Sequence, residues 1–146
     1  MSARSLSKFL RMFINNGSSL LNPRSIAEMK LVVGNGLIPH YGIDATLNSI
    51  GITPPNYGLG WYWQNLSDGR KYIGHSGSLP GARHWMLVNE ENTLGVFILT
   101  NGDSNVPSGR AKEVYKTFED IHLALFRCFE GNTVRSSACC NTVSFV

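Results

Sequence analysis

The segment Gly74-His75-Ser76-Gly77-Ser78 places an imidazole, two hydroxyls and two glycines within five positions. A serine hydroxyl activated by a base can attack an acyl carbon, which makes the segment worth testing as a nucleophile motif. A nucleophile elbow, G-x-S-x-G, would need glycine at the position of Ser78 and a sharp turn from strand into helix. The residues that follow predict another strand, so the segment is interpreted as a strand motif and not as an elbow.

The sequence on either side of this motif predicts antiparallel strands. Residues 57–63 are rich in aromatic side chains and lead to Asp68-Gly69, a strong hairpin signal, after which residues 70–75 resume as a strand. Two more strands are predicted over residues 84–88 and 93–101, separated by a polar turn. The motif therefore lies between two predicted hairpins.

Helices must cover this sheet on both sides. The run from Leu94 to Leu99 is apolar on both faces of its strand, and such a strand needs a packed layer above and below. Apolar residues at helical spacing predict helices over residues 3–15, 22–33 and about 108–129. The predicted fold class is α+β, an antiparallel sheet of three or more strands with packed helices.

Two segments show no such periodicity. Residues 34–56 combine glycines, prolines and isolated apolar side chains, which indicates a connecting segment. After Gly131 the composition changes abruptly, and we expect residues 132–146 to form a disordered tail. The predicted organisation is one domain over residues 1–131 followed by that tail.

Composition and charge exclude several classes of protein. The net charge of +3 is small and the basic residues are scattered, so nucleic-acid binding is not expected. The longest apolar run has the length of a strand, so no membrane span is predicted. Residues 1–6 enter an amphipathic pattern without the apolar core of a secretion signal, which leaves the localisation unknown.

The cysteines give no sign of a metal or disulfide framework. Cys128, Cys139 and Cys140 lack CxxC spacing and have no neighbouring histidine pattern. No metal site is therefore expected.

Three segments, in order, resemble the C-terminal third of serine β-lactamase-like and penicillin-binding proteins, on the class C and esterase-like side of that superfamily. They are residues 2–12 with 21–29, then Tyr57-Gly58-Leu59-Gly60-Trp61, and then Gly74 to Gly81 running on to Gly102. His75-Ser76-Gly77 matches the place of the superfamily's K-T-G motif, which often reads H-[ST]-G in this branch. The resemblance covers roughly residues 2–130 and implies an incomplete portion of an α/β/α sandwich.

The resemblance implies that no cofactor is needed, because the superfamily's chemistry uses side chains alone, and it implies roles for the motif residues. The catalytic residues it implies are His75 and Ser78, the latter through a backbone amide that stabilises the oxyanion formed during acyl transfer. The substrate-binding residues are Ser76, whose hydroxyl can hydrogen-bond a substrate, and Gly77, which lets substrate approach the backbone. A histidine where the superfamily has lysine is mostly neutral at pH 7, so we expect ester or amide hydrolysis in the complete protein and not penicillin hydrolysis.

The superfamily's nucleophile, the serine of S-x-x-K, is not evident here. The match to check is Ser5-Leu6-Ser7-Lys8, but it lies in a segment that resembles a later helix. Such a serine and lysine are interpreted as a solvated helix face near an N-cap. The chain is therefore predicted to be inactive alone, as a truncated or degenerate copy.

Other functional interpretations stay open. The chain could be a non-catalytic pseudoenzyme or binding protein, or a fragment without function. The remaining histidines, His40, His84 and His122, are interpreted as structural, as is Arg83. Tyr57, Trp61, Tyr62 and Trp63 are interpreted as packing residues, with a substrate cleft as the alternative. Expected partners are a small-molecule, peptide or ester substrate of the complete protein, and a second copy bound through an exposed sheet edge.

Overall fold

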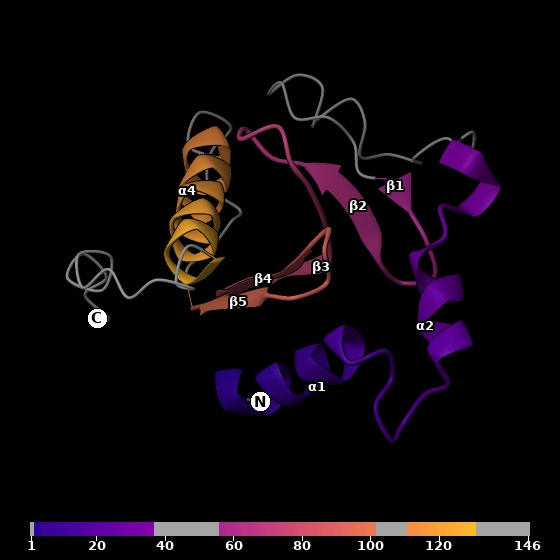
Figure 1. The fold of residues 1–146 in the computed structure, drawn as a ribbon. Coiled ribbons are helices and arrows are strands. Elements are labelled where there is room, and N and C mark those ends of the chain that lie inside the picture. Colours follow the sequence, from indigo (N-terminus) through magenta and orange to yellow (C-terminus); the bar gives the residue numbers. More distant parts are fainter. Residues whose placement is uncertain (1, 37–55, 102–110, 131–146) are drawn as a thin grey trace.

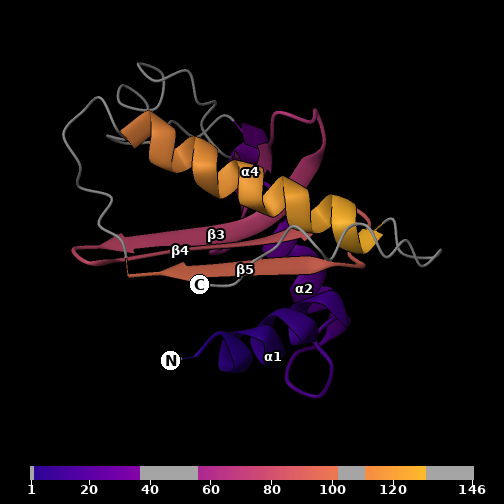
Figure 2. The same ribbon diagram turned by 90° about the vertical axis from the view of Figure 1, so that its left-hand side faces the viewer.

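A computed structural model describes residues 2–36, 56–101 and 111–130, with helices on either side of one sheet (Figures 1 and 2). The helices are α1 (Ala3–Ile14), α2 (Pro23–Lys30), the short 3₁₀ helix η1 (Val33–Gly36) and α4 (Ala111–Glu130). The strands are β1 (Asn56–Tyr57), β2 (Tyr62–Asn65), β3 (Lys71–Leu79), β4 (Ala82–Asn89) and β5 (Gly95–Thr100). The predicted α+β class is confirmed.

All the described strands belong to one antiparallel sheet of order β1-β2-β3-β4-β5, so each strand pairs with its neighbour in sequence. The long strands β3 and β4 pair along eight residues, from Tyr72 opposite Asn89 to Leu79 opposite Ala82. Strand β2 pairs with only the first part of β3, from Lys71 to Gly74. The two strands of the predicted hairpin at Asp68-Gly69 are therefore unequal in length.

The aromatic segment 57–63 is not one strand, which corrects the sequence prediction. Gly58 donates its amide to the carbonyl of Trp61 at 2.6 Å, and Gly60 has a φ of 73°, so the chain turns back between them. Tyr57 consequently pairs with Tyr62 across a hairpin of its own. Glycine accepts positive φ without the Cβ penalty of other residues, and this allows the extra turn.

Each face of the sheet carries its own core. Figure 2 shows α4 above the sheet and α1 below it. On the α1 face, Phe13 stacks on Trp61 and both are buried with Ile73 and Val88. The cluster on the α4 face includes these buried residues: Leu66, Tyr72, Trp85, Leu87, Val96, Phe118, Leu123 and Phe126. This is the pair of covered faces that the doubly apolar run at Leu94 to Leu99 predicts.

The helix boundaries follow local capping chemistry. Ser2 caps α1 by accepting the amide of Ser5 at 3.2 Å, and Asn22 caps α2 by accepting the amide of Arg24 at 2.9 Å. Pro23 occupies the first turn of α2, where its missing N–H costs nothing. Helix α2 ends at Lys30, three residues before the predicted fading point at Val33, because Leu31 is already extended.

Several predictions lie outside the described residues. These are the connecting segment from residue 37 to 55, His40, the start of the last helix before Ala111, and the tail over 132–146 with Cys139 and Cys140. Among the residues described, no helix is long and apolar enough to cross a membrane.

Candidate active site

The motif Gly74-His75-Ser76-Gly77-Ser78 lies on β3, where the pairing of that strand changes. Up to Gly74, β3 has β2 on one side and β4 on the other. From His75 to Leu79 it pairs with β4 alone, and no other strand of the described sheet lies beside it. The motif therefore follows a lateral strand edge, where backbone groups can meet another chain segment or a ligand.

Alternation along β3 sends the motif side chains to opposite faces of the sheet. Ile73 belongs to the core on the α1 face and Tyr72 to the core on the α4 face. His75 and Gly77 therefore lie on the α1 face, while Ser76 and Ser78 lie on the α4 face. The structure brings the four predicted site residues together along one strand, but not onto one surface.

His75 is exposed, and its pKa is lowered. Burial of part of the ring lowers the pKa of His75 below its usual 6.5, and the neighbouring His84 lowers it further. The ring of Tyr62 lies 6.0 Å from the His75 ring. The imidazole is accordingly neutral at pH 7, as the substitution of histidine for lysine predicts.

Ser76 is engaged by a residue that sequence reasoning assigned to packing. Ser76 lies beside the buried Tyr62, and the interaction of the two hydroxyls lowers the pKa of Tyr62 against a larger raising effect of burial. The net result raises the pKa of Tyr62 to about 12. Tyr62 pairs with Gly74, so Tyr62 lies on the strand next to Ser76 and on the same face of the sheet. In the sequence, only the predicted hairpin at Asp68-Gly69 could have indicated this neighbourhood.

Gly77 lies against the imidazole of His84. A Cβ built on Gly77 would come within 2.2 Å of Cε1 and 2.3 Å of Nε2 of that ring. The two residues are directly opposite in the β3/β4 register, on the α1 face that also carries His75. His84 was interpreted as a structural histidine, and its place beside the motif is the main feature that the sequence analysis missed.

The segment Ser5-Leu6-Ser7-Lys8 forms the first turns of α1 on an exposed surface. The hydroxyl of Ser5 lies 3.1 Å from that of the capping Ser2, and Ser7 donates to the carbonyl of Arg4 at 2.8 Å. Lys8 is exposed and lines a shallow depression with Asn15 and Leu20 at the far end of the helix. These local contacts fit the interpretation of a capped, solvated helix face.

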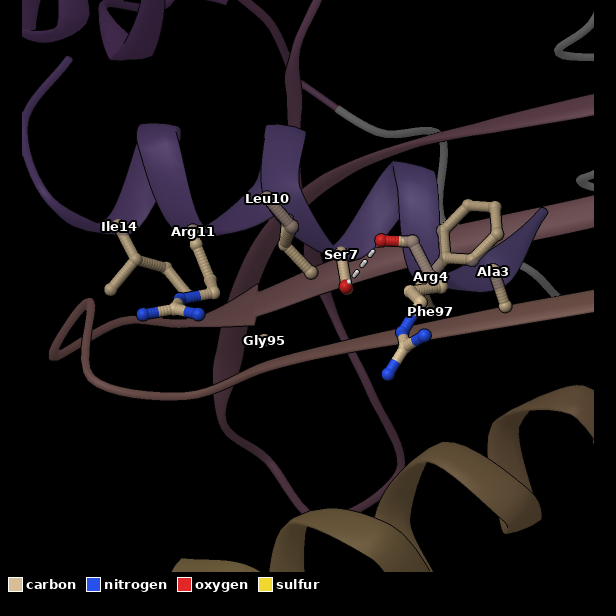
Figure 3. A pocket seen from close by; sticks show the side chains of 8 residues that line it. All are labelled: Ala3, Arg4, Ser7, Leu10, Arg11, Ile14, Gly95 and Phe97. Atoms are coloured by element: carbon tan, nitrogen blue, oxygen red, sulfur yellow. Dashed lines mark hydrogen bonds between the residues drawn. The ribbon is translucent and has the colours of Figure 1, made fainter. Parts of the chain in front are cut away.

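A separate groove of about 370 Å³ lies between α1 and β5 (Figure 3). Arg4 and Arg11 extend from the helix on the side of Gly95 and Phe97, the β5 residues that line the groove. The motif residues of β3 do not line it.

The other residues singled out in the sequence pack into the fold. Trp61 is buried against Phe13, and Trp63 donates its Nε1–H to the carbonyl of Lys30 at 2.8 Å. Arg83 is buried with its guanidinium 4.0 Å above the ring of Tyr115. His122 is fully buried, with Nδ1 2.8 Å from the carbonyl of Phe118. No group of three or more potential metal ligands occurs within the described part of the chain.

The sequence model of the β-lactamase family matches residues 1–118, about four fifths of the chain. The chain belongs to the β-lactamase family. No curated protein matches it.

Among solved structures, this β-lactamase-family chain is similar to a D-stereospecific amidohydrolase from Streptomyces sp., with 24% sequence identity and a TM-score of 0.50. The similarity extends over 77% of this chain but only 28% of the amidohydrolase chain. It supports the β-lactamase-like fold that the sequence predicts, and it means that the chain spans less than a third of that relative's length.

Proposed function

We propose that this chain contributes the motif strand β3 to the active site of a serine hydrolase that cleaves ester or amide bonds. The observation that carries the proposal is the position of residues 75–79, paired with β4 on one side and with no described strand on the other. Pairing with β4 holds the backbone of this stretch in place, and fixed backbone donors are what an oxyanion requires. The proposal takes acyl transfer as the reaction because the chain belongs to the β-lactamase family.

The motif residues have separate roles in this proposal. The amide of Ser78 donates to the oxyanion, and His75 acts as a neutral hydrogen-bonding group beside the reacting acyl carbon. Gly77 gives the substrate close access to the backbone, and Ser76 holds the substrate through its hydroxyl, which lies beside Tyr62. The neutral His75 favours substrates without a carboxylate, because it supplies no fixed cation at pH 7.

The nucleophile in this proposal comes from an S-x-x-K helix of the whole protein and not from Ser5. Ser5 and Lys8 are exposed on a capped helix, whereas an activated serine needs its base within hydrogen-bond reach and a site that excludes water. If the native reading frame contains no such helix, the alternative is a binding protein that uses the same strand without catalysis.

The amide of Ser78 is the sharpest point at which to test the proposal. Ser78→Pro removes the N–H, whereas Ser78→Ala keeps it and removes only the hydroxyl. In the whole protein, Ser78→Pro is expected to lower kcat for p-nitrophenyl ester hydrolysis by about 100-fold or more, the usual effect of losing one oxyanion donor. Ser78→Ala is the matched control and is expected to keep most of the activity.

The folding of both variants is checked by circular dichroism and by thermal unfolding. Equal activity of folded Ser78→Pro and Ser78→Ala would refute the assignment of this amide. Absence of ester hydrolysis and of fluorophosphonate labelling in the unmodified whole protein would favour the binding alternative.

A further inference from the structure

On the α1 face of the sheet, the side chain of His84 from β4 packs against the motif strand β3. The imidazole of His84 lies so close to Gly77 that a methyl group there would overlap two of its ring atoms, at 2.2 and 2.3 Å. The ring also lies beside Phe97 of β5, with 6.2 Å between ring centroids and a tilt of 32°. His84 is thus held between β3 and β5 on the α1 face.

This position also makes His84 a neighbour of His75. His75 is opposite Met86 and Gly77 is opposite His84, so the two histidines occupy diagonal positions on adjacent strands of the same face. Diagonal side chains on one face are within reach of each other, and the mutual repulsion of two imidazolium groups is among the causes that lower the pKa of His75.

We infer that His84 is a positioning residue of the proposed site, which packs its ring against Gly77, fixes the backbone there and lies diagonally beside His75. The inference rests on the proposed function only in calling this strand an active-site strand. The substrate class that fits such a pair is an ester or amide whose acyl part carries no carboxylate. Imidazole side chains offer hydrogen-bond donors and acceptors but, unlike lysine, no permanent positive charge.

Other titratable groups near the pair must be accounted for. Tyr62 approaches His75 from β2, and Arg4 of α1 lines the groove beside Phe97. Burial keeps Tyr62 protonated far above neutral pH, so it adds no charge. Arg4 is a constant cation across the range in which histidines titrate, so it cannot imitate a change caused by removing His84.

The close approach at Gly77 can be tested by a double-mutant cycle on the chain itself. Gly77→Ala is expected to lower the urea midpoint of unfolding, because its methyl group meets the His84 ring, which must shift. His84→Ala should restore a large part of that loss, since the obstacle is a side chain. Gly74→Ala is the matched control, because its Cβ would meet the backbone oxygen of Met86 at 1.8 Å and no change at residue 84 can relieve that.

The effect on His75 is tested by NMR titration of the imidazole protons. His84→Gln is expected to raise the pKa of His75, because the charge repulsion between the two imidazoles is removed while a polar side chain of similar reach remains. His122→Gln, which changes a histidine in the core of the α4 face, should leave the pKa of His75 unchanged.

Rescue of Gly77→Ala together with a raised pKa of His75 supports the inference. Failure of the rescue, or rescue with an unchanged pKa of His75, overturns it and leaves His84 as a packing residue. If Gly77→Ala does not fold in either background, the titration of His84→Gln decides alone. Neither the double-mutant cycle nor the titration needs enzyme turnover. The inference about His84 can therefore fail while the whole protein hydrolyses esters, and it can hold while the whole protein does not.

Discussion

Arg70 and Glu130 form a two-pronged ion pair that joins the residue just before β3 to the last residue of α4. Nη1 of Arg70 donates to Oε2 of Glu130 at 2.5 Å, and Nη2 donates to Oε1 at 3.1 Å. Asn89, at the end of β4, adds a hydrogen bond of 2.7 Å to the same carboxylate. The pair thus fixes the helix over the hairpin that leads into the motif strand.

Glu130→Gln should destabilise the chain by about 1 kcal/mol at pH 7, since one charged partner of a partly exposed pair is lost. Arg70 holds the pKa of Glu130 below its usual value. The stability difference between wild type and variant should therefore be complete above the ordinary glutamate pKa and disappear as the pH falls through the lowered one. Urea unfolding of both proteins at pH 7 and at pH 3 to 5 measures this stability difference.

Lys116 and Asp120 provide the matched control for this ion pair. They form an exposed i,i+4 pair on the same helix, 2.9 Å apart. Asp120→Asn should leave the unfolding midpoint unchanged, because exposed pairs of this kind gain little over solvated charges. An equal loss in Glu130→Gln and Asp120→Asn would contradict the anchoring role of Arg70.

The stacking of Phe13 on Trp61 is the central contact between α1 and the sheet. The ring centroids are 3.6 Å apart with an interplanar angle of 14°, and Phe13 is fully buried. Phe13→Ala should cost about 3 to 5 kcal/mol in the free energy of unfolding, the range for truncating a buried phenylalanine. Phe9 lies 6.0 Å from the same tryptophan but is 42% exposed, so Phe9→Ala should cost much less.

The fold was predictable where one periodicity extends over many residues. The apolar stripe of α1 and the doubly apolar run of β5 required a layer on each side of the sheet, and α1 and α4 provide these layers. The break of residues 57–63 into two strands was not predictable in the same way. It depends on a single turn at Gly60, and a local conformation of that kind overrides the strand propensity of the aromatic residues.

The candidate site was likewise predictable from the sequence only in part. Recognition of His75 to Ser78 needed only neighbouring residues of the motif. The roles of Tyr62 and His84 depend on register across two hairpins, and a shift of one residue would send either side chain to the other face. Periodicity alone does not fix register to one residue, so these two contacts required the structure.

Stability should fall in mild acid because of His122. Burial lowers the pKa of His122 below 6.5, and hydrogen bonding to the backbone carbonyl of Phe118 offsets only part of this effect. Below pH 6.5 the unfolded chain then binds a proton that the folded chain resists, so the free energy of unfolding decreases as the pH decreases. One such group contributes at most about 1.4 kcal/mol per pH unit.

The measurement is urea unfolding from pH 7 to pH 5. His122→Leu should flatten the dependence on pH, because no imidazole has to stay neutral in the core. His75→Gln is the comparison, and it should flatten the curve less because His75 is exposed. A variant His122→Leu that keeps the full slope would show that other groups cause the acid sensitivity.

A lysine in place of His75 should change the substrate preference of the whole protein. The permanent cation of His75→Lys favours substrates with a carboxylate next to the acyl group, whereas the neutral imidazole does not. We expect the ratio of kcat/KM for a carboxylate-bearing ester to that for its neutral analogue to rise in the variant. His75→Gln is the uncharged control, and an unchanged ratio in His75→Lys would count against the proposed role of this residue.

Strand β5 should mediate self-association of the chain at high concentration. Within the described sheet it has a neighbour only on the β4 side, and its sequence, Gly95-Val96-Phe97-Ile98-Leu99-Thr100, contains neither a charge nor a proline. Natural edge strands avoid pairing with a second copy by carrying such residues. Leu99 is 43% exposed on this strand, so Leu99→Lys places a charge at the edge without removing a core side chain.

Sedimentation velocity over a concentration series is expected to show oligomers of the wild-type chain and more monomer for Leu99→Lys. Leu20→Lys is the matched control, because Leu20 is 74% exposed in the turn after α1 and lies outside the sheet. The same charge there should leave the association unchanged if the contact is edge to edge. A wild-type chain that sediments as a monomer at all concentrations would show that the outer edge of β5 is protected, and an equal effect of both lysines would assign the change to net charge alone.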